Sequence, residues 1–178
     1  IYRVLMNKEM TQIIYCSPLK SGNCSISDTV TTICEGAFCG CGKLTSVSIP
    51  DSVISIGESV FSNCSSLESV LIPDSIISIG NNAFSDCCAL TSVIIPKSVT
   101  SIGWKSFYGC YKLRTVTIPR GLSFPGNAFI GSCNMTLTDT KLFSFTSEYD
   151  RALDLTFCLT PLVVDELFKP DIHLTTLQ

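Results

Sequence analysis

The sequence predicts an α/β repeat solenoid, in which short parallel strands and compact helical or 3-10 turns recur over about five coils of 23 residues. Two observations support this prediction. A 23-residue block repeats without a gap from residue 26 to residue 140, and its apolar residues fall on the same positions in successive blocks. A block this short cannot bury its own apolar edge, so neighbouring blocks must stack and form one continuous core.

Five positions of the block hold the same residue in nearly every copy, and they alternate between turn and strand segments. These residues are Phe38, Phe61, Phe84 and Phe107; Cys41, Cys64, Cys87, Cys110 and Cys133; Leu44, Leu67, Leu90 and Leu113; Val47, Val70, Val93 and Val116; and Ile49, Ile72, Ile95 and Ile118. Because the five columns recur in phase, we predict that they form the core of the solenoid, with the phenylalanines and cysteines as ladders of buried side chains.

Each block divides into two extended pieces and a turn. The segment "LxxVxIP" alternates like a short strand whose Leu, Val and Ile face inward, and its proline ends the strand because proline has no N–H to donate. The segment "SVxSIG" indicates a second short strand, and its glycine (Gly57, Gly80 or Gly103) permits a sharp bend. The segment "xxFxxCxxL" predicts a compact helical or 3-10 turn. The period falls within the roughly 20–29 residues of leucine-rich repeats.

The blocks divide the chain into three parts: residues 1–25, 26–140 and 141–178. The first part predicts an irregular hairpin around Asn7–Met10 that continues into a loop, "SPLKSGN". The second is the solenoid, whose last coil is degenerate: Phe129 comes one position early, and Asp139 stands where valine is expected. The third contains "EYDRALDL" and "LVVDELFKP", which predict two short helices, either as a cap or as an unrelated tail.

The composition limits the classes of partner that the protein is expected to bind. A net charge of −3 and a pI near 5.0 give no electrostatic basis for binding nucleic acid. No apolar run approaches the ~18 residues that span a membrane, so we expect no membrane insertion in this segment. Because the chain starts at Ile1 rather than Met, we interpret it as a piece of a longer protein and of a longer repeat array.

Three interpretations of the cysteine column are open. Coils about 4.8 Å apart place equivalent Cα atoms within disulfide range, but side chains in register point the same way rather than at each other. The column also lies between the phenylalanine and leucine columns, where cysteine packs as a small buried hydrophobe. We predict a buried thiol ladder, with disulfide pairing and metal binding as the alternatives.

The residues give little support to catalysis or to a metal site. Zinc sites use CxxC pairs or histidines at short spacing, whereas the short spacings here are Cys39–Cys41 and Cys87–Cys88, and the only histidine is His173 in the tail. A cysteine nucleophile needs a nearby base, and none is apparent. We expect no catalytic residue, cofactor or metal. The 11 cysteines, an odd number, exclude complete pairing within the chain.

Three Asn-x-Ser/Thr sequons, at Asn23, Asn63 and Asn134, are candidate glycan acceptors if the protein is secreted from a eukaryotic cell. Repeats rich in serine also generate such sequons by chance. Asn23 is predicted to lie in a loop and Asn63 in the compact turn, so we expect Asn23 to be the more accessible of the two. The sequence leaves glycosylation at all three open.

Two surfaces are candidates for binding a protein, and solvated polar surface is the alternative for both. The outward positions of the "LxxVxI" strand form a strip of small hydroxyls with two apolar residues at its centre, a pattern that favours protein contact mildly: Ser46, Ser48, Ser69, Leu71, Ser92, Ile94, Thr115 and Thr117. One coil also concentrates aromatic and basic residues, which are typical interface anchors: Trp104, Lys105, Tyr108, Tyr111, Lys112 and Arg114.

The pattern "IPDSVxSIGxxxFxxCxxLxSVxIP", from Ile26 to Ile118, resembles the BspA-like (Treponema-type) leucine-rich repeats. Residues 2–26 also resemble the irregular unit that interrupts such arrays. The resemblance implies a surface protein of a host-associated bacterium or a parasitic protist such as a trichomonad, with a role in adhesion to host cells or matrix. It implies a non-enzymatic binding surface for a protein partner. An intracellular scaffold is the alternative, and an enzyme fragment a distant one.

Overall fold

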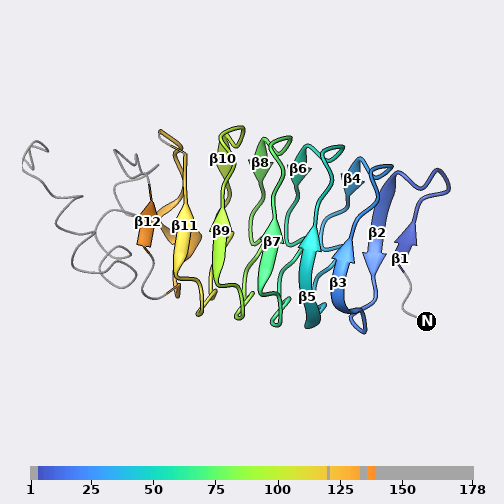
Figure 1. Cartoon of the computed structure of the whole chain (residues 1–178), viewed down its shortest axis with the longest axis horizontal. Helices are drawn as coiled ribbons and strands as arrows, with labels where there is room; N and C mark the ends of the chain where they lie inside the picture. Colours follow the sequence, from blue (N-terminus) through green and yellow to red (C-terminus); the bar gives the residue numbers. More distant parts are fainter. Residues whose placement is uncertain (1–3, 120, 133–135, 139–178) are drawn as a thin grey trace, which may run out of the picture.

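The computed structural model describes residues 4–119, 121–132 and 136–138. Successive coils stack along the long axis of the molecule and place their strands in two columns (Figure 1). The first column contains β3 (Ser21–Ser25), β5 (Lys43–Ser48), β7 (Ser69–Leu71), β9 (Ser92–Ile94), β11 (Thr115–Thr117) and β12 (Thr136–Thr138). The second contains β2 (Gln12–Cys16), β4 (Thr32–Ile33), β6 (Ser55–Ile56), β8 (Ser78–Ile79) and β10 (Ser101–Ile102).

The strands within each column pair in parallel, which confirms the predicted repeat solenoid. The register repeats the 23-residue period: Val47 lies opposite Val70, and Val93 lies opposite Val116. Hydrogen-bonded pairing divides each column into two sheets, β3-β5-β7 and β9-β11-β12 in the first column, and β1-β2-β4 and β6-β8-β10 in the second.

The turns that join the strands are successive β-turns rather than helices. In the described part of the chain the one helical element is the 3-10 turn η1 (Gly126–Phe129). Each of the four turns before η1 has two residues of positive φ four positions apart, such as Ser59 (φ 55°) and Asn63 (φ 59°). A left-handed residue interrupts the right-handed hydrogen-bond pattern of a helix, so the expected helical turn does not develop.

The turns are also bonded from coil to coil, like the strands. The backbone N–H groups of Ser59, Phe61 and Asn63 donate to carbonyls 22 residues later, at 2.8–2.9 Å. The same pattern repeats in the next coil from Asn82 and Phe84. The left-handed residues turn these N–H groups along the solenoid axis, so the turn becomes a third column of inter-coil hydrogen bonds and leaves few of its backbone groups unpaired.

Aromatic stacking fills the core beneath the turns. Phe38, Phe61, Phe84, Phe107 and Phe129 form one continuous ladder, with neighbouring ring centroids 5.0–5.3 Å apart and interplanar angles between 2° and 28°. Such near-parallel rings at this separation are offset stacks, which are favourable for aromatic pairs. The first four rings have no exposed surface, and together with the Leu and Ile columns they form the continuous core.

The glycines that follow the second strand have a different role from the one predicted. None of Gly57, Gly80 and Gly103 has a positive φ. A Cβ at Gly80 would instead lie 2.7 Å from the carbonyl carbon of Gly57, and one at Gly103 would lie 2.5 Å from the nitrogen of Asn81. Glycine is needed here because the backbones of adjacent coils approach too closely for a side chain.

The N-terminal part is a hairpin joined to an incomplete coil. Strand β1 (Val4–Met6) pairs antiparallel with β2, and the side-chain oxygen of Asn7 accepts hydrogen bonds from the N–H groups of Thr11 (2.8 Å) and Gln12 (2.9 Å) to close the connection. Part of the predicted loop "SPLKSGN" belongs to β3, which pairs with β5. A tight turn therefore links β2 directly to β3, and this unit lacks the phenylalanine turn of a regular coil.

The last coil is shortened rather than lost. Phe129 stacks on Phe107 although it follows by only 22 residues, and Leu137 lies opposite Val116, 21 residues earlier. Leu137 thus occupies the position that valine has in the other coils. The sequence predicts Asp139, two residues later, at this position. Asp139 itself, Cys133, Asn134 and the two predicted helices of residues 141–178 lie outside the described residues.

Candidate protein-interaction surface

The outward side chains of the first strand column form two parallel rows. Strand pairing places Ser46 opposite Ser69 and Ser92 opposite Thr115 in one row. In the other row, it places Ser48 opposite Leu71 and Ile94 opposite Thr117. The rows follow from the two-residue period of a strand, since the valine between them points into the core. We call these eight residues the strand face.

The strand face is most exposed at its centre. Leu71 is 65% exposed and Ile94 68%, the highest values among the large apolar residues described. They lie where the column divides between the β3-β5-β7 and β9-β11-β12 sheets, and Val70 beneath them is only partly buried. Large apolar side chains held this far into solvent by a rigid sheet are typical of contact surfaces.

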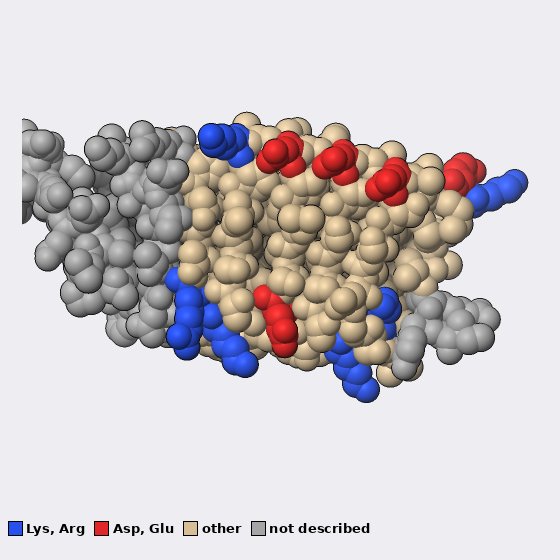
Figure 2. All heavy atoms as spheres, in the orientation of Figure 1, with Lys and Arg blue, Asp and Glu red and all other residues tan. Residues whose placement is uncertain are grey.

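Charged residues lie at the edges of the strand face rather than on it. Figure 2 shows a mainly acidic row along the upper edge, a mixed row along the lower edge and an uncharged band between them. One position of the repeat holds Asp28, Asp51 and Asp74 in successive coils, and then Lys97. Strands β7, β9 and β11 contain no charged residue. Charge-poor centres with charged rims are the usual anatomy of protein interfaces.

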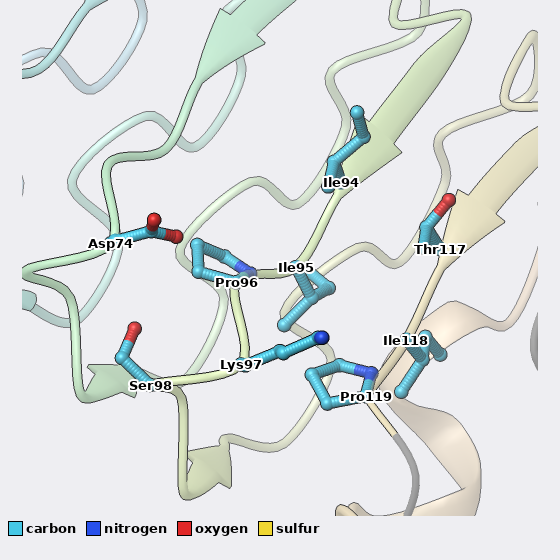
Figure 3. Close-up of a pocket in the computed structure, with 9 residues that line it drawn as sticks. All are labelled: Asp74, Ile94, Ile95, Pro96, Lys97, Ser98, Thr117, Ile118 and Pro119. Carbon is cyan, nitrogen blue, oxygen red and sulfur yellow. The ribbon is translucent and has the colours of Figure 1, made fainter.

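A groove of about 1020 Å³ opens at the end of strands β9 and β11, next to Ile94 and Thr117 (Figure 3). Proline corners form its floor: Pro96 and Pro119 follow the buried Ile95 and Ile118. Its remaining lining residues are Asp74, Lys97 and Ser98. The Lys97 side chain extends from its own coil toward Pro119 (Figure 3).

The strand face therefore continues into a hollow at this end, where an acidic and a basic side chain lie on neighbouring coils. Sequence reasoning missed the groove. The change from Asp74 to Lys97 in one repeat column was the signal available for it. A second, shallower hollow of about 460 Å³ lies over β3, β5 and β7 and reaches Leu71 from the other side.

The structure brings three members of the aromatic and basic cluster together. The Lys105 Nζ lies 4.4 Å from the centroid of the Trp104 ring and 5.0 Å from that of Tyr108. Tyr111 (59% exposed) follows in the same turn, and Lys112 and Arg114 lead into β11. Because the Lys105 ammonium group already lies over the Trp104 and Tyr108 rings, these three side chains form cation–π contacts with each other and leave less aromatic surface for a partner.

The second strand column also exposes a pair of apolar residues that sequence reasoning missed. Ile54 (59% exposed) and Ile77 (50% exposed) precede β6 and β8 at one position of the repeat. The Ile77 N–H donates to the Ile54 carbonyl at 2.9 Å, so the two lie in adjacent coils. The variable residue of "SVxSIG" was the signal for this pair.

The cysteine column is buried, and its thiols are bonded to the preceding coil. The S–H groups of Cys64, Cys87 and Cys110 donate to the carbonyls of Phe38, Phe61 and Phe84, each at 3.2 Å. Burial raises the pKa of Cys64 to about 12, and it also raises the pKa values of Cys87 and Cys110. These thiols stay protonated at neutral pH, so they are poor nucleophiles. All nine cysteines described are free.

Both described sequons are exposed. Asn23 lies in strand β3 rather than in the predicted loop, and its side-chain oxygen accepts a hydrogen bond from Thr45 (3.2 Å). Asn63 occupies a left-handed position at the tip of its turn, and its Nδ2 donates to Ser62 (3.1 Å). Asn63 is therefore more accessible than its place in a compact turn predicted.

The repeat of this chain matches a known protein family. The BspA type leucine rich repeat region matches residues 10–136 in six copies. The chain belongs to the BspA-type leucine-rich repeat family. The match begins in the N-terminal hairpin and ends in β12, so the family extends past both ends of the Ile26–Ile118 pattern. No curated protein matches the chain.

Solved structures of other leucine-rich repeat proteins share the fold. A leucine rich cell surface protein from Faecalibacterium prausnitzii is 28% identical, with a TM-score of 0.69 over 84% of this chain and 38% of its own. A leucine-rich repeat protein from Bacteroides ovatus is 30% identical, with a TM-score of 0.60 over 82% of this chain and 44% of its own. This chain thus spans less than half the length of either protein.

A third relative supports the fold alone. The T. pallidum leucine rich repeat protein is 24% identical, with a TM-score of 0.59 over 77% of both chains. Within the described part of this BspA-type chain, no helix has the length and apolar character needed to cross a membrane.

Proposed function

We propose that this BspA-type solenoid is a non-enzymatic protein-interaction module that binds its partner through the strand face. The observation that supports this proposal is the uncharged band between two charged edges, with Leu71 and Ile94 exposed at its centre. An exposed apolar centre surrounded by small hydroxyls favours a protein partner, because hydroxyls add hydrogen bonds without a large desolvation penalty.

The rigidity of the solenoid supports the same proposal. Coil-to-coil hydrogen bonds in the strands and in the turns hold the face in place, so binding orders little backbone. Solenoids characteristically use such extended surfaces for binding. The groove beside Ile94 extends the area available to a partner and gives it a charged rim at Asp74 and Lys97.

We further propose that the module belongs to a cell-surface protein that adheres to a host or matrix protein. Membership in the BspA-type family and likeness to a leucine rich cell surface protein from F. prausnitzii support this proposal. The expected partner is a protein with an apolar contact patch that matches Leu71 and Ile94.

The binding proposal is tested with a matched pair of variants. The immobilised solenoid is incubated with a solubilised extracellular-matrix extract, and bound proteins are identified by mass spectrometry. Ile94→Asp should fold normally and lose the captured protein, while Ile77→Asp places the same charge at a similarly exposed residue in the other strand column and should keep it. Equal binding by wild type and Ile94→Asp would exclude the strand face as the binding site for the captured protein.

The location is tested separately on the full-length protein in its own cells. Surface biotinylation of intact cells should label it together with known surface proteins. A protein that stays unlabelled under these conditions would refute the adhesion role and leave an intracellular scaffold that uses the same face.

A further inference from the structure

We propose that Cys16 and Cys41 form a redox-active thiol pair that a small peroxide converts into a disulfide. This site lies at the N-terminal end of the solenoid, where β2 meets the first regular turn, and it is independent of the strand face. The pair makes a cluster of contacts that Cys64, Cys87 and Cys110, the other described cysteines of the column, do not make.

The two thiols converge on one short segment of backbone. The Cys41 sulfur lies 3.7 Å from the Cys16 carbonyl oxygen and 3.6 Å from that of Ser17, and the Cys16 sulfur lies 3.9 Å from the same Ser17 oxygen. The two side chains are also close enough that a hydrogen-bonding interaction between them shifts the pKa of each. Both residues have no exposed surface, so the pair is enclosed by its own neighbours.

The irregular N-terminal unit explains why only this pair meets. In a regular coil, the thiol of Cys64 lies against the carbonyl of Phe38 and the backbone N–H of Cys41. Cys87 and Cys110 repeat this arrangement one and two coils later. Those thiols are engaged by backbone and point in parallel.

Cys41 has no such turn in front of it, because β2 continues directly into β3 through a tight turn. Its thiol therefore lies against the Cys16 and Ser17 carbonyls and also contacts the Cys16 side chain. The 25-residue spacing of this pair breaks the 23-residue register, so the parallel orientation that opposes disulfides elsewhere in the column does not apply.

The surroundings give the two thiols different roles. The hydrogen bond from Cys41 holds the pKa of Cys16 below its usual value, against the opposing effect of burial, and the charge of Lys20 adds to the lowering. Lys20 is held nearby, since its Nζ donates to the Ser21 and Asn23 carbonyls (3.1 and 2.7 Å). The pKa of Cys41 is raised by the same hydrogen bond. Cys16 is the nucleophile and Cys41 the resolving thiol.

The reaction balances with one peroxide. The Cys16 thiolate attacks hydrogen peroxide, whose O–O bond breaks, and gives Cys16 sulfenic acid and hydroxide. The Cys41 sulfur then attacks the sulfenic sulfur, and the hydroxyl group leaves as water with the Cys41 proton. The two thiols are oxidised to a disulfide, and the peroxide is reduced to water.

Access to the buried pair comes through the hairpin of β1 and β2. Val4 of the three-residue strand β1 pairs with Cys16, and β2 is the one described strand with which β1 pairs. A strand this short opens locally at low free-energy cost, which admits a molecule as small as hydrogen peroxide. The disulfide then fastens the N-terminal unit to the first regular coil.

The experiment treats the reduced chain with hydrogen peroxide, removes the peroxide, blocks all free thiols with N-ethylmaleimide in denaturant so that buried thiols react too, and maps the peptides by mass spectrometry. A peptide pair linked through Cys16 and Cys41 is the expected product. Cys41→Ser should accumulate a sulfenic acid on Cys16 that dimedone traps, whereas Cys16→Ser should leave Cys41 unoxidised. Cys64→Ser, the control in the regular part of the column, should leave the yield of the linked peptide unchanged.

Three outcomes would overturn the proposal. The first is oxidation of the exposed Cys39 while Cys16 and Cys41 stay reduced. The second is a Cys16 disulfide to the neighbouring Cys24 instead of Cys41. The third is dimedone labelling of Cys41 in the Cys16→Ser variant, which would reverse the two roles. Wild-type mapping decides the first two outcomes even if a serine variant folds poorly.

Discussion

The Ser132 hydroxyl donates a hydrogen bond of 3.1 Å to the carbonyl of Phe107, just as the Cys110 thiol donates to the carbonyl of Phe84 one coil earlier. Ser132 is fully buried and follows Phe129 by three residues, the spacing of every F-x-x-C turn. The structural role at this position is thus a small donor under the next turn, and oxygen fulfils it as well as sulfur.

Cys87→Ala should lower the free energy of unfolding by about 1–2 kcal/mol, because it removes packing and a hydrogen bond to the Phe61 carbonyl. Cys87→Ser keeps the donor and should lose less. Urea denaturation followed by circular dichroism measures both, with exposed Cys39→Ala as the neutral control. Equal losses for the alanine variants of Cys87 and Cys39 would contradict the buried role.

Stability should fall as the pH rises above about 8.5, where an unfolded thiol begins to ionise. Burial raises the pKa of Cys64 to about 12, so the folded chain keeps a proton that the unfolded chain loses. Unfolding then releases protons, and each such thiol costs about 1.4 kcal/mol per pH unit between these two values. Urea midpoints measured at about pH 8 and pH 10 should show a steep decline that Cys64→Ala reduces. A flat profile for the parent chain would refute this prediction.

Phe84→Ala should cost about 3–5 kcal/mol, because the fully buried ring stacks on Phe61 (5.3 Å) and Phe107 (5.2 Å) and its loss leaves a cavity between coils. Ile94→Ala removes a side chain that is 68% exposed and serves as the control. Thermal and urea unfolding measure both variants. A Phe84→Ala variant as stable as the control would show that the ladder is not a structural element.

Gly80→Ala should lower stability by about 1–3 kcal/mol, since its Cβ would lie 2.7 Å from the Gly57 carbonyl carbon and force two coils apart. Gly57→Ala is the matched control, because the nearest atom to its Cβ would be the Glu35 Cγ at 3.6 Å, an ordinary contact. Urea midpoints of the two variants should therefore separate clearly. If Gly57→Ala were the more damaging change, close coil packing would not explain the glycine column.

Much of the fold could be predicted from the sequence, and so could the direction in which the strand face points. The period of Phe61, Phe84 and Phe107 predicts stacking, because residues in register must lie above one another in a solenoid. The exposure of Leu71 and Ile94 follows from strand alternation. The groove beside Ile94 could not be predicted, since its shape depends on how the proline corners of adjacent coils, at Pro96 and Pro119, are placed in space.

The sequence by itself determined the repeat, its period and its buried columns. Equivalent positions of successive coils are buried, so they require apolar residues at the same interval. Tertiary structure alone decided how the chain packs where the period breaks. Phe129 joins the ladder through a shortened coil, since hydrogen bonds and ring stacking select the register rather than residue count. The same freedom places Cys16 next to Cys41: the irregular unit lacks a phenylalanine turn, so the first thiol of the column, Cys41, lies beside Cys16 of β2.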